Sequence, residues 1–367
     1  MNEKIFVTQP FFPDRKLFDS YVDRIWEGKW LTNNGPLAME FENKLIDYLQ
    51  TKNVTLTVNG HLALEIAVRA LDLTGEVITT PFTFASTTHS ITSAGLTPVF
   101  CDIDPETLTI DVTKIETLIT DKTSAIAPVH VYGHPCNVRE IERIAKKYNL
   151  KVIYDAAHAF GVKLEETKGI CEFGDISMLS FHATKLFNTI EGGALAYNGN
   201  YKRKLDLFKN FGIENEDTVS CIGLNAKMNE FQAAMGLSNI GYIDDIICRR
   251  KVLTGHYRTR LDEIPGIRYF VPEKTEGVKY NYSYMPVCIN PVEYGMDRNA
   301  LYLKLKEQDI FARKYFYPIT SEFDCYKHLP SDVPEAKKAS ESVLCLPIYY
   351  DLTIEQIDRI CDIIKSR

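Results

Sequence analysis

One lysine, Lys185, stands where it could carry chemistry. It follows an apolar segment that ends at Ser180 and Phe181, and the pair Gly192-Gly193 comes shortly after it. A lysine removed from water loses its proton easily, and the neutral amine forms a Schiff base with a carbonyl group. Most lysines are solvated, so the segment alone also fits a surface lysine in a βα loop. The other motifs of the chain decide between these interpretations.

The segment Asn59-Gly60-His61 is a candidate phosphate site. It lies between a short apolar run and a helical pattern over residues 62–71. A helix N-terminus offers free backbone N–H groups and the positive end of the helix dipole, and both bind phosphate. The alternative is an ordinary βα turn with Asn59 as the helix N-cap. The glycine fingerprint GxGxxG is absent, which argues against a nicotinamide dehydrogenase.

Asp155 and His158 form a second candidate pair. Asp155 follows an apolar strand and precedes Ala156 and Ala157, so a flat ring could approach it closely. Its carboxylate could keep a pyridine nitrogen protonated, while His158 donates to a ring oxygen. Asp155 could equally be a helix N-cap.

Two further segments add weaker candidates. Phe84, after the run over residues 77–80, could stack on a ring, although such a residue is more often part of the core. Asn225 and Lys227 open a long helical pattern, where they could cap the helix or reach an anion.

Short β-branched runs alternate with helical patterns in the first two thirds of the chain. We expect strands at residues 54–58, 77–80, 97–101, 124–130, 151–154, 177–181 and 194–197, and helices at 62–71 and 138–148. This alternation predicts an α/β fold with a mostly parallel sheet covered on both faces. The ligand should then bind at the carboxyl ends of the strands, where the candidate residues stand.

The pattern changes near residue 240, and at 367 residues two domains are expected. We predict an N-terminal arm and large domain over residues 1–240 and a smaller α+β domain over 241–367. A long helix should span residues 229–261, followed by strands at 267–270 and 282–289 and helices at 298–308 and 354–364. The first 40 residues, with turn signals at Pro10, Pro13 and Gly35-Pro36, are expected to be an arm and loop.

The composition and charge of the chain argue against several classes of function. The net charge of −7, without blocks of like charge, gives no footprint for nucleic acid. No apolar run has the length of a membrane span, and the first residues lack the apolar core of a signal peptide. Nine cysteines lie at least 16 residues apart, without a CxxC pair, so neither a zinc site nor another metal site is expected. Scattered thiols indicate a reducing cytoplasm.

Together the candidates are the parts of one site: a phosphate cradle, a stacking aromatic, a carboxylate for a ring nitrogen, a hydroxyl and a lysine. Their order along an α/β sheet is what a pyridoxal phosphate enzyme needs. The chain resembles the sugar-nucleotide aminotransferases of the DegT/DnrJ/EryC1/StrS family, within the fold type I pyridoxal phosphate enzymes. The resemblance runs nearly end to end through residues 28–36, 57–60, 81–84, 98–104, 128–133, 155–161, 180–185, 191–193, 225–228 and 315–318.

The resemblance implies a role for each candidate residue. Lys185 matches the lysine that carries pyridoxal 5'-phosphate, Asp155 the partner of the pyridine nitrogen, and His158 the contact of the ring hydroxyl. Phe84 matches the stacking aromatic. The phosphate contacts match Gly60, His61 and Ser180, with Asn225 supplied by a second subunit, so the resemblance implies a homodimer with shared sites.

Two positions depart from the family pattern. Lys227 stands where many members carry arginine; it is still a cation that could face the sugar nucleotide, but it lacks the planar fork. His61 replaces a frequent Thr or Ser, so it must use its backbone N–H or a ring nitrogen. Some relatives replace the cofactor lysine by histidine and catalyse deoxygenation, whereas this chain retains Lys185.

The resemblance also suggests a substrate. Residues 181–189 are similar to the branch that aminates dTDP-4-keto-6-deoxyglucose to dTDP-4-amino-4,6-dideoxyglucose (viosamine), with glutamate as the amino donor in similar enzymes. Arg313, Tyr315 and Tyr317 are candidate substrate contacts, with packing in the smaller domain as their alternative role. A 3-aminotransferase and a UDP-sugar 4-aminotransferase are near alternatives, and a non-catalytic regulator that binds sugar or cofactor is a remote one.

Overall fold

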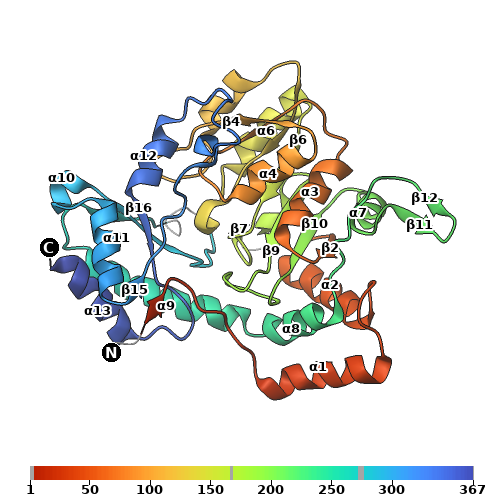
Figure 1. Cartoon of the computed structure of the whole chain (residues 1–367), viewed down its shortest axis with the longest axis horizontal. Helices are drawn as coiled ribbons and strands as arrows, with labels where there is room; N and C mark the ends of the chain where they lie inside the picture. Colours follow the sequence, from red (N-terminus) through yellow and green to blue (C-terminus); the bar gives the residue numbers. More distant parts are fainter. Residues whose placement is uncertain (1–3, 166–167, 272–276, 367) are drawn as a thin grey trace.

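The computed structural model describes residues 4–165, 168–271 and 277–366. A large α/β part surrounds a central sheet, and a smaller part, which includes the C-terminal helices, lies at one end (Figure 1). The long helix α9 (Ile243–Leu261) runs between them.

The central sheet has seven strands in the order β2-β10-β9-β6-β5-β3-β4. Only β10 runs antiparallel to its neighbours, so the sheet is mixed and mostly parallel, which confirms the predicted fold class. Each of the seven expected strands is present within three residues of its predicted ends. Their bounds are β2 Asn53–Thr57, β3 Glu76–Thr79, β4 Thr97–Phe100, β5 Thr123–Ala127, β6 Lys151–Asp155, β9 Ile176–Ser180 and β10 Gly193–Tyr197.

Helices cover both faces of this sheet. On one face lie α3 (Gly60–Ala70), α4 (Ala85–Ser93) and α7 (Lys202–Lys209); on the other lie α2 (Pro36–Leu49), α6 (Val138–Tyr148) and α8 (Glu230–Ile240). Successive side chains of a strand point to opposite faces of the sheet, so each strand contributes to the cores on both faces. In β10, Ala194 and Ala196 face the α2 side, while Leu195 and Tyr197 face the α3 side. Shorter elements of this part are α5 (Val112–Ile115) and the pairs β7 (Lys163–Glu165) with β8 (Lys168–Gly169) and β11 (Ile213–Asn215) with β12 (Thr218–Val219).

The smaller part has its own core and sheet. Its three-stranded antiparallel sheet has the order β13-β14-β16, and its buried cluster is built from Ile5 and residues between 253 and 364. Its elements are β13 (Ile267–Tyr269), β14 (Met285–Ile289), α10 (Pro291–Tyr294), α11 (Arg298–Glu307), β15 (Ile310–Phe311), α12 (Pro334–Ser342), β16 (Val343–Leu346) and α13 (Ile354–Lys365). Strand β1 (Ile5–Phe6) pairs with β15, so this strand lies against the smaller part.

Two expectations about helices are wrong. The first 40 residues are not only arm and loop, because they contain α1 (Arg15–Gly28) and the start of α2. Asp14 caps α1 by accepting from the N–H groups of Lys16 and Leu17. The helix expected over residues 229–261 is two helices, since α8 ends at Ile240 and α9 begins after Gly241 and Tyr242. The strand expected at residues 282–289 begins only at Met285.

Among the helices of the described residues, none combines the length and apolar character that a membrane crossing requires.

Candidate active site

Lys185 lies in the turn-rich segment between β9 and β10. Backbone hydrogen bonds from Phe181 to Gly192, from Thr189 to Phe181 and from Lys185 to His182 fix this segment at the carboxyl end of β9. The side chain is half-buried, and its Nζ lies 3.4 Å from the hydroxyl of Tyr284. Burial lowers the pKa of Lys185, against the opposing effects of Asp155 and Tyr315. The lysine therefore loses its proton more easily than an ordinary solvated lysine.

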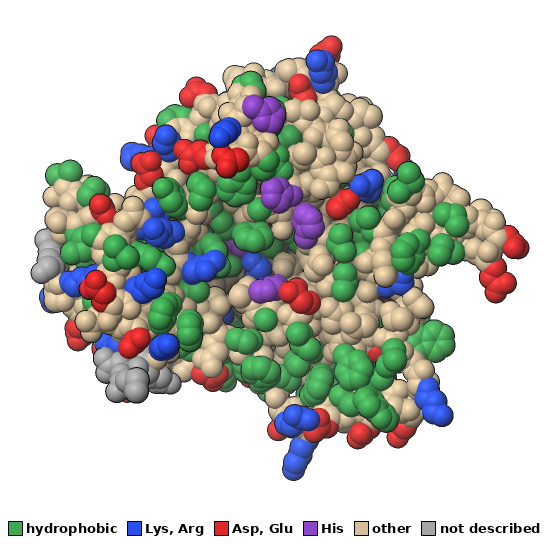
Figure 2. Space-filling model, in the orientation of Figure 1, with side chains coloured by type: hydrophobic (Ala, Val, Ile, Leu, Met, Phe, Trp, Pro, Cys, Tyr) green, Lys and Arg blue, Asp and Glu red, His purple; other side chains and the backbone are tan. Residues whose placement is uncertain are grey.

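A cavity of about 450 Å³ opens above Lys185. Figure 2 shows it as a hollow near the middle of the molecule, with histidine and cationic side chains at its wall. Of the predicted site residues, it brings together Gly60, His61, Phe84, Asp155, His158, Ser180, Lys185, Arg313 and Tyr315. The first seven come from the start of α3, which follows β2, from loops that follow β3, β6 and β9, or from the ends of β6 and β9, at the expected edge of the sheet.

Asp155 is a buried carboxylate with two fixed hydrogen bonds. It ends β6, and its oxygens accept from the Thr87 hydroxyl at 2.7 Å and from the Ala157 N–H at 3.0 Å. Burial raises the pKa of Asp155, while these hydrogen bonds and the nearby Lys185 oppose that effect. A buried carboxylate of this kind favours a protonated ring nitrogen as its partner.

His158 is held as a neutral imidazole. Its Nδ1 accepts from the backbone N–H of Tyr132 at 3.0 Å, so the proton resides on Nε2. Burial keeps the pKa of His158 well below its usual value, and Lys185 adds to this shift. The ring therefore acts as an uncharged donor through Nε2.

Gly60, His61 and Ser180 form the corner expected to hold phosphate. Asn59 caps α3 by accepting from the Leu62 N–H at 2.8 Å, and the N–H groups of Gly60 and His61 have no intrahelical partner at this first turn. A Cβ on Gly60 would lie 3.0 Å from the Cβ of Ser180, so glycine permits the close approach of helix and strand. The Nδ1 of His61 is buried without a hydrogen-bond partner.

The remaining predicted residues lie outside this cavity. Tyr317 borders the neighbouring groove, whereas Asn225 and Lys227 lie apart, near the β11–β12 pair. Lys227 donates to the Asn225 side-chain oxygen at 2.9 Å and lies over the ring of Phe211. Asn225 is exposed and does not line the cavity above Lys185.

Several residues that line the cavity or support its side chains were missed by sequence reasoning. Thr87 bonds Asp155, and it stands inside the segment around Phe84 that the sequence did indicate. His182 and Glu191 line the mouth, 3.4 Å apart, on the segments that flank Lys185. Tyr284 comes from a segment 99 residues beyond Lys185, and no local signal marks it.

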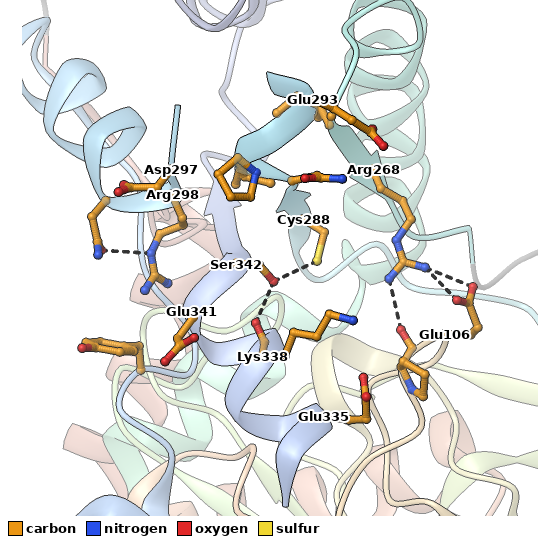
Figure 3. Close-up of a pocket in the computed structure, with 18 residues that line it drawn as sticks. Glu106, Arg268, Cys288, Glu293, Asp297, Arg298, Glu335, Lys338, Glu341 and Ser342 are labelled. Atoms are coloured by element: carbon orange, nitrogen blue, oxygen red, sulfur yellow. Dashed lines mark hydrogen bonds and ion pairs between the residues drawn. The ribbon is translucent and has the colours of Figure 1, made fainter. Parts of the chain in front are cut away.

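A larger cleft, of about 1040 Å³, is lined mostly by the smaller part of the molecule, with Pro105 and Glu106 from the loop after β4 (Figure 3). Within it, Arg268 bonds Glu106, and Arg298 bonds Asn299 and the backbone. Among the predicted site residues it touches Tyr317 alone. The cavity above Lys185 is therefore the candidate active site. In the described part of the chain, no group of three or more His, Cys, Asp or Glu side chains is placed to hold a metal ion.

Known proteins resemble this chain over its full length. A dTDP-4-amino-4,6-dideoxy-D-glucose transaminase of Shigella dysenteriae is 44% identical over 370 residues, and one of Escherichia coli is 44% identical over 373 residues; both alignments cover 100% of each chain. The solved structure of DesI in the presence of its TDP-sugar product superposes with a TM-score of 0.95 at 32% identity, covering 100% of this chain and 93% of the other.

The fold and the lysine–aspartate cavity define a fold type I pyridoxal phosphate enzyme. Residues 14–365 match the DegT/DnrJ/EryC1/StrS aminotransferase family, and the chain belongs to it. It is therefore an aminotransferase that depends on pyridoxal phosphate, as predicted. The residues of the cavity fit that cofactor, because a buried carboxylate, a neutral imidazole donor, an open helix N-terminus and an enclosed lysine surround one space.

Proposed function

We propose that this enzyme aminates C4 of dTDP-4-keto-6-deoxyglucose to give dTDP-4-amino-4,6-dideoxyglucose, with glutamate as the amino donor. The observation that carries this proposal is the full-length similarity to two transaminases named for that product, in a chain that retains the cavity lysine.

Pyridoxal phosphate, when bound, supplies an electron sink for the carbanion at the reacting carbon. Lys185 carries the cofactor and, once released, takes the proton from Cα of glutamate as a general base. In the second half of the cycle its Nζ delivers a proton to C4 of the sugar as a general acid. Its lowered pKa suits both roles, because a group that titrates closer to neutral pH can both gain and lose a proton.

The neighbouring side chains hold the cofactor in place. Asp155 keeps the ring nitrogen protonated, His158 donates to the ring oxygen, and Phe84 stacks on the ring face. Gly60, His61 and Ser180 take the phosphate at the N-terminus of α3. These assignments are supported by the positions of the residues around one cavity.

A groove beside the cavity suits the nucleoside diphosphate. It has a volume of about 370 Å³ and shares Thr83, Phe84, Arg313, Tyr315 and Phe316 with the cavity above Lys185. Its lining includes Arg313 and Lys314, together with several aromatic rings, and no carboxylate. Lys314 lies over the rings of Tyr302 and Tyr317. Cations can hold the diphosphate while rings stack on the base, so we assign Arg313, Tyr315 and Tyr317 to the substrate.

A second copy of the chain completes the site. Large apolar side chains are exposed on α1, α2, the loop between them and the β11–β12 region: Trp26, Trp30, Leu31, Met39, Val219 and Ile222. Figure 2 shows apolar side chains gathered over the region of α1 and α2. Such patches favour association. In a homodimer, Asn225 would reach the phosphate and Lys227 the sugar nucleotide of the other subunit.

The thiols support a cytoplasmic location. All nine cysteines are free, which fits a reducing compartment, and we place the protein in the cytoplasm.

The substrate is tested with purified enzyme, glutamate and a panel of keto-sugar nucleotides. We expect amination of dTDP-4-keto-6-deoxyglucose, with NMR locating the new C–N bond at C4. The variant Lys185→Ala should bind the cofactor without turnover. A product aminated at C3, preference for a UDP-sugar, or full activity of Lys185→Ala would contradict the proposal.

A further inference from the structure

The hydroxyl of Tyr284 lies beside the amino group that does the chemistry. Nζ of Lys185 donates to it across 3.4 Å, and the tyrosine, only 7% exposed, lines the same cavity. Tyr284 immediately precedes β14, in a part of the chain that the proposed reaction does not otherwise use.

Packing fixes the ring of Tyr284 on several sides. Its centroid lies 4.6 Å from that of His158 and 5.6 Å from that of Tyr132, and Tyr315 meets it edge-on at 5.9 Å. A ring held between neighbours in this way presents its hydroxyl at one place, so little entropy is lost when it forms a hydrogen bond.

Hydrogen bonds also attach the Tyr284 backbone to the cofactor-binding segment. The Ser283 hydroxyl donates to the His158 carbonyl at 2.9 Å, and the Asn281 amide donates to the carbonyls of His158 and Phe160. From the other side, buried Arg250 on α9 donates to the Ser283 carbonyl at 3.0 Å. The segment that carries Tyr284 is thus fixed to the loop that follows Asp155.

The phenol can serve either protonation state of the lysine. Burial raises the pKa of Tyr284, so its hydroxyl stays neutral. A neutral hydroxyl accepts from an ammonium group and donates to an amine.

We propose that Tyr284 positions the amino group of Lys185 for proton transfer, holding Nζ by a hydrogen bond whenever the lysine is not attached to the cofactor. This inference rests on the proposed function, in which the released lysine moves the proton. Without the hydroxyl, the flexible four-carbon chain samples more rotamers, and the productive geometry is populated less often. The loss should therefore appear in kcat and not in KM.

The test compares Tyr284→Phe with Tyr280→Phe. Phenylalanine keeps the ring packing and removes only the hydroxyl. Tyr280 is a matched control, because it is a buried tyrosine of the same segment whose hydroxyl donates to the Tyr132 carbonyl at 2.8 Å instead. For Tyr284→Phe we expect kcat to fall about 10-fold, which is less than the loss of a general acid–base group because Lys185 itself remains, with KM for both substrates nearly unchanged. The deuterium isotope effect with α-deuterated glutamate should rise, because proton transfer becomes slower.

A second readout follows Lys185 directly. Cyanate reacts with neutral amines and carbamylates them. We would measure the rate of Lys185 carbamylation by mass spectrometry over a range of pH, on enzyme with the cofactor in its amine form. The dependence of this rate on pH gives the apparent pKa of the lysine. The Tyr284 hydroxyl binds the charged ammonium form of Lys185 more strongly than the neutral amine, because hydrogen bonds to charged groups are the stronger ones. Removing the hydroxyl should therefore lower the pKa of Lys185 by about 0.5 to 1. Tyr280→Phe should match the wild type. An isotope effect and a labelling profile unchanged in Tyr284→Phe would overturn the inference. If the wild type aminates no keto sugar, the labelling profile still decides the role of Tyr284.

Discussion

At the scale of single residues, the site depends on charges that have been taken out of water. Asp155 and Lys185 line one cavity, and each favours the charged form of the other while burial opposes both. His158 beside them is kept neutral. These three side chains therefore offer an anion, a titratable amine and an uncharged donor, which is the set that the proposed reaction needs.

Replacing Asp155 by asparagine tests the carboxylate. Asparagine has the same size, and it can accept from Ala157 and donate to the Thr87 hydroxyl, so the fold should persist. Because the fixed negative charge is lost, we expect kcat to fall about 100-fold or more. The rate of the glutamate half-reaction, followed by cofactor absorbance, measures this effect. Thr87→Ser, which keeps the hydroxyl, serves as the control, and an Asp155→Asn enzyme close to wild-type rate would refute the assignment.

The sequence could predict site residues that stand next to strand ends, since the position of a strand end sets the position of the loop that follows it. Asp155, Ser180 and Lys185 are of this kind. It could not predict Tyr284, because its contact with Lys185 joins residues 99 positions apart and depends on how the smaller part packs. The roles assigned to the predicted residues stay predictions until the variants are measured.

At the scale of elements, the strands were predictable because apolar β-branched runs alternate with amphipathic helices. α1 was missed because the turn signals at Pro10, Pro13 and Gly35-Pro36 flank it, although Asp14 provides a helix cap. The break between α8 and α9 was missed because the helical pattern is continuous on both sides of it and only Gly241 interrupts the pattern. The domain division at residue 240 remains a prediction.

The start of β10 controls the phosphate corner, and a glycine substitution tests this. A Cβ on Gly193 would lie 2.6 Å from the backbone carbon of Asn59, so Gly193→Ala must push β10 away from the turn before α3. We expect a loss of about 1–3 kcal/mol in stability and faster release of the cofactor. Urea denaturation and cofactor fluorescence measure the two effects.

A substitution at a second glycine, Gly255, should change the stability in the opposite direction. Gly255 lies exposed within α9, and a Cβ there would meet nothing within 4 Å. Gly255→Ala should therefore stabilise the protein by about 0.5–1 kcal/mol through helix propensity. If Gly193→Ala and Gly255→Ala changed the stability of the protein equally, the close approach at Gly193 would not be the cause of the change in Gly193→Ala.

At the scale of the whole molecule, a shared site predicts complementation between two inactive variants. Lys185→Ala removes the base, and Asn225→Asp places a negative charge where the cofactor phosphate of the other subunit would lie. A hybrid dimer then contains one site with both changes and one intact site. Random mixing should restore about a quarter of wild-type activity, because half of the dimers are hybrids with one working site each. Activity no higher than that of the separate variants would show that Asn225 acts within its own subunit or not at all.

The pairing of β1 with β15 has a consequence for synthesis on the ribosome. Ile5 is fully buried in a core whose other members lie between residues 253 and 364. Strand β1 must therefore remain without its partner until some three hundred further residues have been translated. The large sheet, whose strands end at Tyr197, can form during that interval, whereas the amino-terminal segment is among the last pieces to find its place.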